Sequence, residues 1–132
     1  MKPDDEHARA LIEAARQVRD HAYAPYSGFR VGAAVLTEAG NVHAGCNVEN
    51  ASYGATICAE RAALFRMVAS GDARPVAIAV FVDAAEPAMP CGMCRQVISE
   101  FGRDVLVVTA TPDRVKHSTI AELLPDAFVL PR

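Results

Sequence analysis

The stretch from Cys58 to Arg95, CAERAALFRMVASGDARPVAIAVFVDAAEPAMPCGMCR, decides the fold of this chain of 132 residues. The segment from Ile57, directly before this stretch, to about Ala69 is apolar almost all round and predicts a helix that is buried on most sides. The continuous apolar run from Val76 to Val82 is typical of a central strand covered on both faces. A second helix is predicted from Cys91 to about Phe101. Helix, strand and helix therefore follow one another in this stretch.

Upstream of it, the sequence predicts a helix, a β-hairpin and a polar loop. Asp4 or Asp5 can cap a helix whose apolar period runs toward Tyr23 and ends at Ala24-Pro25. Two strand-like segments, Phe29 to Thr37 and a second one reaching about Val48, flank a turn and predict a hairpin. A polar loop then leads to the helix that begins near Cys58.

Downstream, Val105 to Thr109 predicts a strand, and a polar stretch from Thr111 to Ser118 separates it from a short helix at Ile120 to Leu124. A hairpin followed by helix, strand, helix and strand implies a mixed sheet with helices packed on both faces. The predicted fold is an α/β, three-layer α/β/α sandwich.

The composition is that of one globular domain, which we expect to span residues 1–132. Net charge is −3 and no cluster of Lys and Arg stands out, which argues against binding of a nucleic-acid polymer. The N-terminus lacks the apolar region of a secretory signal, and no apolar stretch approaches the ~20 residues that span a bilayer. We therefore expect a soluble, cytoplasmic protein with no membrane partner.

Three of the four cysteines have the spacing of metal ligands. Cys91 and Cys94 are three residues apart and share one face of a predicted helix, while Cys58 begins the other helix. Three thiolates can bind one Zn²⁺ per subunit and leave a fourth position for water, whose pKa the metal lowers to about 7. Such a site is typical of a hydrolase.

Charged residues beside the cysteines favour a catalytic site. Glu60 is two residues after Cys58, in place to act as a proton shuttle for a water at the metal. Three thiolates around Zn²⁺ leave a net charge of −1, which weakens the Lewis acid unless it is offset. The positive ends of the two helices can offset it, and Arg61 and Arg95 can donate hydrogen bonds to the sulfurs.

Other interpretations of the cysteines stay open. Cys91 and Cys94 alone could be a redox dithiol. A structural zinc site usually has four protein ligands, and Cys46 could in principle be the fourth, although a free cysteine in such a strand is usually a small buried hydrophobe. Glu60 discriminates between these, because a structural site has no use for a carboxylate there.

With these motifs, the chain resembles the small cytidine deaminases of the cytidine/deoxycytidylate deaminase family. Cys58-Ala59-Glu60 and Pro90-Cys91-Gly92-Met93-Cys94 are similar to the zinc deaminase signature, a ligand with Glu two residues on and then P-C-x-x-C. The likeness extends through residues 24–27 with 29–34, through 45–51, and through 122–125 with Phe128, and so covers nearly the whole chain. A cysteine as first ligand implies the three-cysteine, homotetrameric branch, whose active sites are shared between subunits.

The resemblance implies a role for each matching residue. Zinc ligation falls to Cys58, Cys91 and Cys94, and the proton shuttle is Glu60. For substrate binding, the resemblance implies that Phe29 stacks near the pyrimidine and that Asn47 and Glu49 hold the ribose 3′-hydroxyl. It also implies that Ala59 contacts the substrate. Tyr53 would lie near the shared pockets, and Phe128 would reach a neighbouring subunit's pocket.

The implied activity is hydrolytic deamination of free cytidine and 2′-deoxycytidine to uridine and 2′-deoxyuridine with release of ammonia, a step of pyrimidine salvage. Two alternatives remain at this point. One is an aminohydrolase for a modified cytosine nucleoside such as blasticidin S, and the other is a zinc-stabilised binding protein without turnover.

Overall fold

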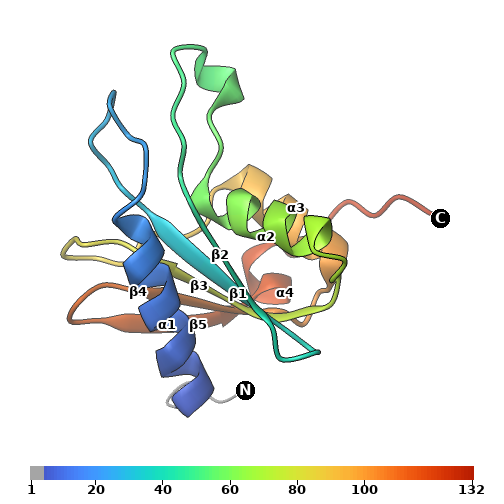
Figure 1. The fold of residues 1–132 in the computed structure, drawn as a ribbon. Coiled ribbons are helices and arrows are strands. Elements are labelled where there is room, and N and C mark those ends of the chain that lie inside the picture. The colour runs from blue at the N-terminus through green and yellow to red at the C-terminus, as the bar shows by residue number, and fades with distance from the viewer. Residues whose placement is uncertain (1–4) are drawn as a thin grey trace.

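Five strands form one mixed sheet with helices on both faces (Figure 1) in the computed structural model, which describes residues 5–132. The strand order is β2-β1-β3-β4-β5. β1 is antiparallel to β2 and β3, β4 is parallel to β3, and β5 is antiparallel to β4. The strands span Gly32–Thr37 (β1), Val42–Cys46 (β2), Pro75–Phe81 (β3), Leu106–Ala110 (β4) and Val115–Thr119 (β5).

Alternating side chains of the central strands supply a separate core on each face of the sheet. On one face, α1 (Glu6–Arg19) packs Leu11 and Ala15 against Ala34 and Val108. The opposite core joins the sheet to three helices, α2 (Ala59–Ala69), α3 (Gly92–Phe101) and α4 (Ile120–Leu123). The predicted three-layer α/β/α fold is therefore confirmed.

Two glycines let helices lie directly against the hairpin. A Cβ atom on Gly45 of β2 would lie 2.4 Å from the backbone nitrogen of Ala63 in α2. A Cβ atom on Gly32 of β1 would lie 1.9 Å from the carbonyl oxygen of Ala15 in α1. Only glycine allows these approaches without movement of backbone, so the position of α2, which begins directly after Cys58, depends on Gly45.

The hairpin is confirmed, but its strands are shorter than predicted. β1 begins at Gly32 and not at Phe29, because the Asn47 side chain occupies backbone groups of residues 29–31. Asn47 Oδ1 accepts from Val31 N at 2.9 Å, and Nδ2 donates to the Phe29 carbonyl oxygen at 2.8 Å. β2 ends at Cys46, two residues before the predicted end at Val48.

The first helix also ends earlier than predicted, at Arg19 instead of Ala24-Pro25. Beyond Arg19, Tyr23 makes a β-bridge with Val48, which requires an extended backbone. The N-terminal cap is Asp5, whose side chain accepts from His7 N, and the alternative cap Asp4 lies outside the described residues.

Two further expectations need correction. The polar stretch Thr111 to Ser118 includes all but the last residue of β5, an edge strand that is polar because one of its sides faces solvent. In this single chain α2 is not buried on most sides, since Phe65 is 50% and Val68 49% exposed. Among the described residues, no helix has the length and apolar character needed to cross a membrane.

Candidate metal centre

The starts of α2 and α3 bring three cysteines together. Cys58 and Cys91 are the residues that precede these helices, and Cys94 lies in the first turn of α3. Their Sγ atoms all lie within 4.8 Å of one another, and those of Cys58 and Cys91 are 4.0 Å apart. Sulfurs bound to one tetrahedral zinc at ~2.3 Å are separated by about 3.8 Å. The three thiols therefore fit a single tetrahedral ion.

The first of these cysteines favours the thiolate. Its pKa is lowered to about 5, chiefly by a hydrogen bond from the Cys94 thiol and further by one from Arg61. The same bond, together with burial, raises the pKa of Cys94. Cys58 also lies at the positive end of the α2 dipole, which stabilises negative charge.

The two arginines expected near the sulfurs have different partners. Arg61 Nη2 donates to Cys58 Sγ at 3.5 Å and to the Thr56 carbonyl oxygen at 3.4 Å. Arg95 instead donates to two carbonyl oxygens, those of Pro90 at 2.7 Å and Leu123 at 2.9 Å. Sequence spacing placed both arginines near the ligands. It did not reveal that, of the two, Arg61 donates to a cysteine sulfur and Arg95 to backbone carbonyls.

Glu60 is buried in the first turn of α2. Burial raises the pKa of its carboxyl to about 7, and the negative charge of Cys58 acts in the same direction. A carboxyl with a pKa near neutrality can both accept and donate a proton at physiological pH.

A cavity of about 200 Å³ opens beside the sulfurs. Six residues that the sequence nominated line it, namely Phe29, Asn47, Cys58, Ala59, Glu60 and Cys91. The other lining residues were missed, and they are Val31, Thr56, Ile57, Val80, Ala88 and Met89. Four of these, Thr56 and Ile57 before Cys58 and Ala88 and Met89 before Pro90, directly precede the ligand motifs, so adjacency to a motif was the available signal. The largely apolar wall suits a flat ring.

Glu49 and Tyr53 line a neighbouring hollow, which shares Thr56 with the first. The Glu49 carboxylate accepts hydrogen bonds from Tyr26 N at 2.9 Å, from Ser27 N at 3.1 Å and from the Ser27 hydroxyl. The bond from the Ser27 side chain is the main cause that lowers the Glu49 pKa. The rings of Tyr26 and Tyr53 meet edge to face, with centroids 6.4 Å apart.

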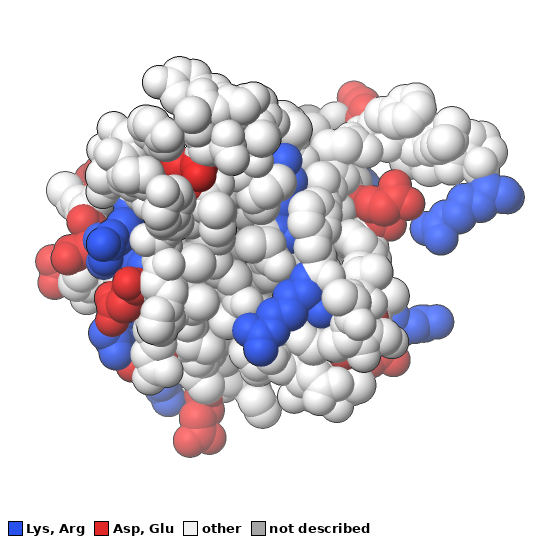
Figure 2. Space-filling view, turned by 45° about the horizontal axis from the view of Figure 1, so that its top comes forward, with Lys and Arg blue, Asp and Glu red and all other residues white. Residues whose placement is uncertain are grey.

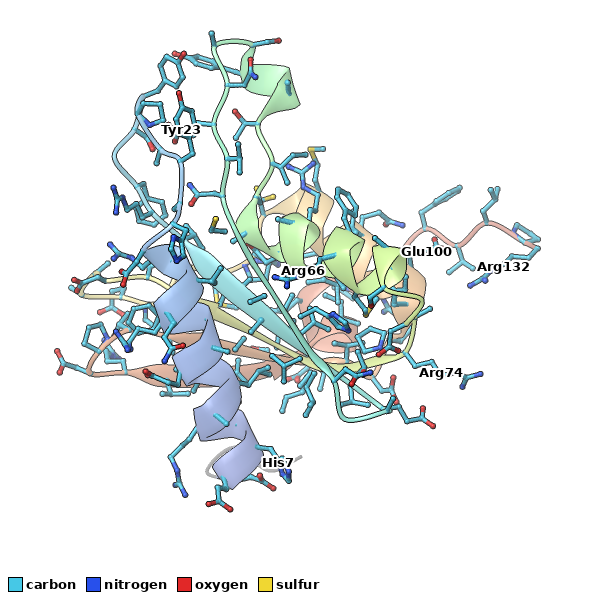
Figure 3. The ribbon with its side chains drawn as sticks, viewed as in Figure 1. His7, Tyr23, Arg66, Arg74, Glu100 and Arg132 are labelled. Carbon is cyan, nitrogen blue, oxygen red and sulfur yellow. The ribbon has the colours of Figure 1, made fainter. Side chains whose placement is uncertain are left out.

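Phe128 lines neither of these cavities. It belongs to the C-terminal tail, where its side chain is 70% exposed and its carbonyl oxygen accepts from Gln96 Nε2 at 3.3 Å. Figure 3 shows Arg132 on this tail, and it pairs with Glu100 of α3 at 3.7 Å. The structure thus keeps Phe128 apart from the other nominated residues of the same chain.

Cys46 is partly buried and lies outside the cluster of potential metal ligands found among the described residues. Burial raises the pKa of its thiol. It therefore has the character of a small apolar side chain and gives no support to a fourth cysteine ligand.

Comparison with known proteins identifies a family model and close relatives. Residues 5–110 match the model described as "Cytidine and deoxycytidylate deaminase zinc-binding region". A cytidine deaminase of Sporosarcina psychrophila is 46% identical over 120 residues, which cover 89% of this chain and 88% of that protein. One from Halalkalibacterium halodurans is 49% identical over 120 residues, covering 89% and 91%.

Among solved structures, the cytidine deaminase from Burkholderia pseudomallei superimposes with a TM-score of 0.88 at 50% sequence identity. The matched region covers 94% of this chain and 99% of that one. The similarity therefore extends beyond the cysteine motifs to nearly the whole fold.

Proposed function

The chain belongs to the cytidine and deoxycytidylate deaminase family, and we propose on this basis that it hydrolyses free cytidine and 2′-deoxycytidine to uridine and 2′-deoxyuridine, releasing ammonia. One observation carries this proposal beyond family membership. The buried Glu60 carboxyl lines the same cavity as Cys58 and Cys91, so a proton-transfer group and a metal centre share one space.

Cys58, Cys91 and Cys94 would bind one Zn²⁺ ion, as the separations of their sulfurs support. When bound, zinc supplies a Lewis acid and a water whose pKa is lowered to about 7. Arg61 would offset the negative charge of the three thiolates through its hydrogen bond to Cys58.

Glu60 would move the protons of the reaction. Its carboxylate accepts a proton from the water that attacks C4 of the pyrimidine, and the resulting carboxylic acid gives a proton to N3. A further proton, from the adding water, goes to the amine at C4, which leaves as ammonia. Both steps need a group that is ionised and neutral in turn near pH 7, and the pKa of Glu60 supports this role.

The nucleoside would lie along the cavity with its base against Phe29 and its ribose 3′-hydroxyl on Asn47 and Glu49. Both polar side chains already bond to backbone groups, but a carboxylate has about four lone-pair sites and an amide keeps a second N–H, so each retains capacity for a hydroxyl. Ala59 is the first residue of α2, where backbone N–H groups lack helical partners and are available to a ligand.

Free nucleosides are favoured over nucleotides by the charges at the site. The side chains that line the two described hollows include the carboxylates of Glu49 and Glu60 and neither Arg nor Lys. A 5′-phosphate or a polynucleotide would therefore meet like charge without a cationic partner. On the face shown in Figure 2, basic and acidic residues are interspersed, and they form no continuous basic track.

We also propose that the active assembly is a homotetramer with active sites shared between subunits. The exposed apolar groups support this, since Phe65 and Val68 of α2, Tyr53, and Phe128 of the tail would all be covered by second copies. Phe128 and Tyr53 would then take part in pockets formed between subunits. Three thiolate ligands need reducing surroundings, which supports the cytoplasm as the place of action.

The test is a substrate panel with purified, zinc-loaded protein. We expect cytidine and 2′-deoxycytidine to give equimolar ammonia and uracil nucleoside, with CMP and a cytosine-containing oligonucleotide left intact. Faster turnover of CMP or of blasticidin S would contradict the nucleoside assignment. Zinc binding without turnover of any of them would point to a binding protein.

A further inference from the structure

Arg95 donates hydrogen bonds to the backbone on both sides of Cys91, one of the three candidate metal ligands. Its own N–H donates to the Cys91 carbonyl oxygen at 3.0 Å, and its side-chain Nε donates to the Pro90 carbonyl oxygen at 2.7 Å. The peptide groups on both sides of the Cys91 α-carbon are thus held by the same residue. The guanidinium reaches α4 as well, because Nη1 donates to the Leu123 carbonyl oxygen at 2.9 Å.

The two ligand candidates of α3 differ in how packing holds them. Cys94 is fully buried in the core, whereas Cys91 is exposed, as are the next two residues in the sequence. A buried side chain is fixed by its neighbours, but an exposed one has few atoms to restrain it. The position of the Cys91 sulfur therefore depends on the backbone that carries it.

Helix α4, whose Leu123 carbonyl oxygen accepts from Arg95, is itself held firmly in place. α4 begins with a capping box, in which the Thr119 side chain accepts from Glu122 N while the Glu122 carboxylate accepts from Thr119 N. Its first residue, Ile120, is fully buried in the core shared with α2 and α3. The Leu123 carbonyl oxygen is thus a fixed point from which the guanidinium can hold Pro90.

We propose that Arg95 is a positioning residue that fixes Cys91 for metal binding through backbone geometry and not through its charge. It joins the Pro90 carbonyl to the end of α4 and so keeps the Cys91 sulfur within reach of Cys58 and Cys94. This inference rests on the zinc site of the proposed function. A planar guanidinium presents separate nitrogens to two carbonyls in fixed directions, whereas the three donors of a lysine ammonium sit on one nitrogen and rotate.

The experiment measures the rate at which zinc-loaded, full-length protein releases zinc to a chromogenic chelator. Arg95→Lys keeps the charge and loses the two-point geometry, and Arg95→Gln loses both. We expect both variants to release zinc about 10-fold or more faster than the parent, the range found when groups that orient metal ligands are removed. Arg103→Lys is the matched control, because Arg103 donates to Ser99 at the other end of α3, and it should release zinc at the parental rate.

A double-mutant cycle separates positioning of Cys91 from a general effect on the fold. In a Cys91→Ser background, Arg95→Lys should add less than about 2-fold to zinc release, because the group that Arg95 positions is gone. Equal effects in both backgrounds, or equal loss of folded protein in both, would show that Arg95 supports the fold in general and would overturn the inference. The inference would also be overturned if Arg95→Lys released zinc at the parental rate while Arg95→Gln released it fast. That result would assign the effect to the charge of Arg95.

The zinc-release experiment contains no substrate, so its result does not depend on whether the protein deaminates cytidine. A failure of the positioning role can therefore be told apart from a failure of the proposed function. If zinc release depends on Arg95 as expected but the protein does not deaminate cytidine, the positioning role stands and the proposed function is rejected. Parental release from every Arg95 variant would reject the positioning role alone.

Discussion

Two glutamates of this chain show how surroundings decide what one residue type does. Glu60 is buried at the start of α2, and its pKa rises to about 7, whereas Glu49 accepts hydrogen bonds from Tyr26 and Ser27, and its pKa falls. One carboxyl is thus suited to carry protons and the other to remain an anion that holds hydroxyl groups. Sequence spacing nominated both residues, but the opposite shifts follow from burial and from a turn that only the folded chain creates.

The cysteines allow a direct comparison of a ligand with a bystander. Cys94→Ser should reduce zinc content from one equivalent to well below half, because a neutral hydroxyl is a poor substitute for a thiolate. Cys46→Ser should retain both zinc and deaminase activity, since Cys46 lies outside the cluster. Atomic absorption on the purified variants measures this. Zinc loss from the Cys46 variant would restore the four-cysteine structural site.

Asp72 provides a residue-scale prediction about pH. Its carboxylate accepts hydrogen bonds from Thr37 and Asn41, and His43 Nε2 lies 3.6 Å from Asp72 Oδ2. These contacts lower the pKa of Asp72 below the usual 3.8, and the bond from Thr37 is the largest cause. A lowered pKa gives stability that is present above pH 3.8 and is lost as pH falls through the folded-state value.

Asp72→Asn should therefore lower the melting temperature at pH 6, and the gap to the parent should narrow below pH 3.8. Thermal melts across this range, with Asp113→Asn as a surface control, test the linkage. A gap that stays constant down to acid pH would assign the effect to lost hydrogen-bond geometry rather than to charge.

At the scale of elements, the close contact of α2 with β2 connects the fold to the site. A methyl group at Gly45 would meet Ala63 backbone at 2.4 Å, so Gly45→Ala must shift the helix that carries Glu60. We expect a loss of about 1–3 kcal/mol in the free energy of unfolding, the usual effect of overpacking, together with weaker zinc binding. Gly54→Ala, where nothing lies within 4 Å of the added carbon, should change neither property.

The sequence predicted those elements whose pattern is set locally. The buried run around Val80 and the turn between β1 and β2 carried strong signals, and cysteine spacing with Glu60 predicted the metal centre. β5 was missed because an edge strand can be polar, and the start of β1 was misplaced because the Asn47 bonds to residues 29–31 are made across the chain. The set of residues that line the cavity could not be predicted either, since they come from five separate segments of the chain.

For the whole molecule, the exposed face of α2 is the clearest test of assembly. Phe65→Arg places a charge where an apolar subunit contact is proposed, and light scattering should show species smaller than a tetramer. Val115→Arg, a change of similar exposure on β5, is the matched control and should leave the mass unchanged. A stable, fully active monomer of the parent protein would contradict the tetramer itself.

The most direct test of the central claim, that Glu60 moves protons beside a cysteine-bound zinc, is Glu60→Gln, assayed for ammonia release from cytidine and for zinc content in the same preparation. Removal of a general acid–base group typically costs 10²–10⁴-fold in rate, so we expect turnover to fall by at least about 100-fold while one equivalent of zinc remains. Turnover near the parental rate with zinc bound would contradict the claim.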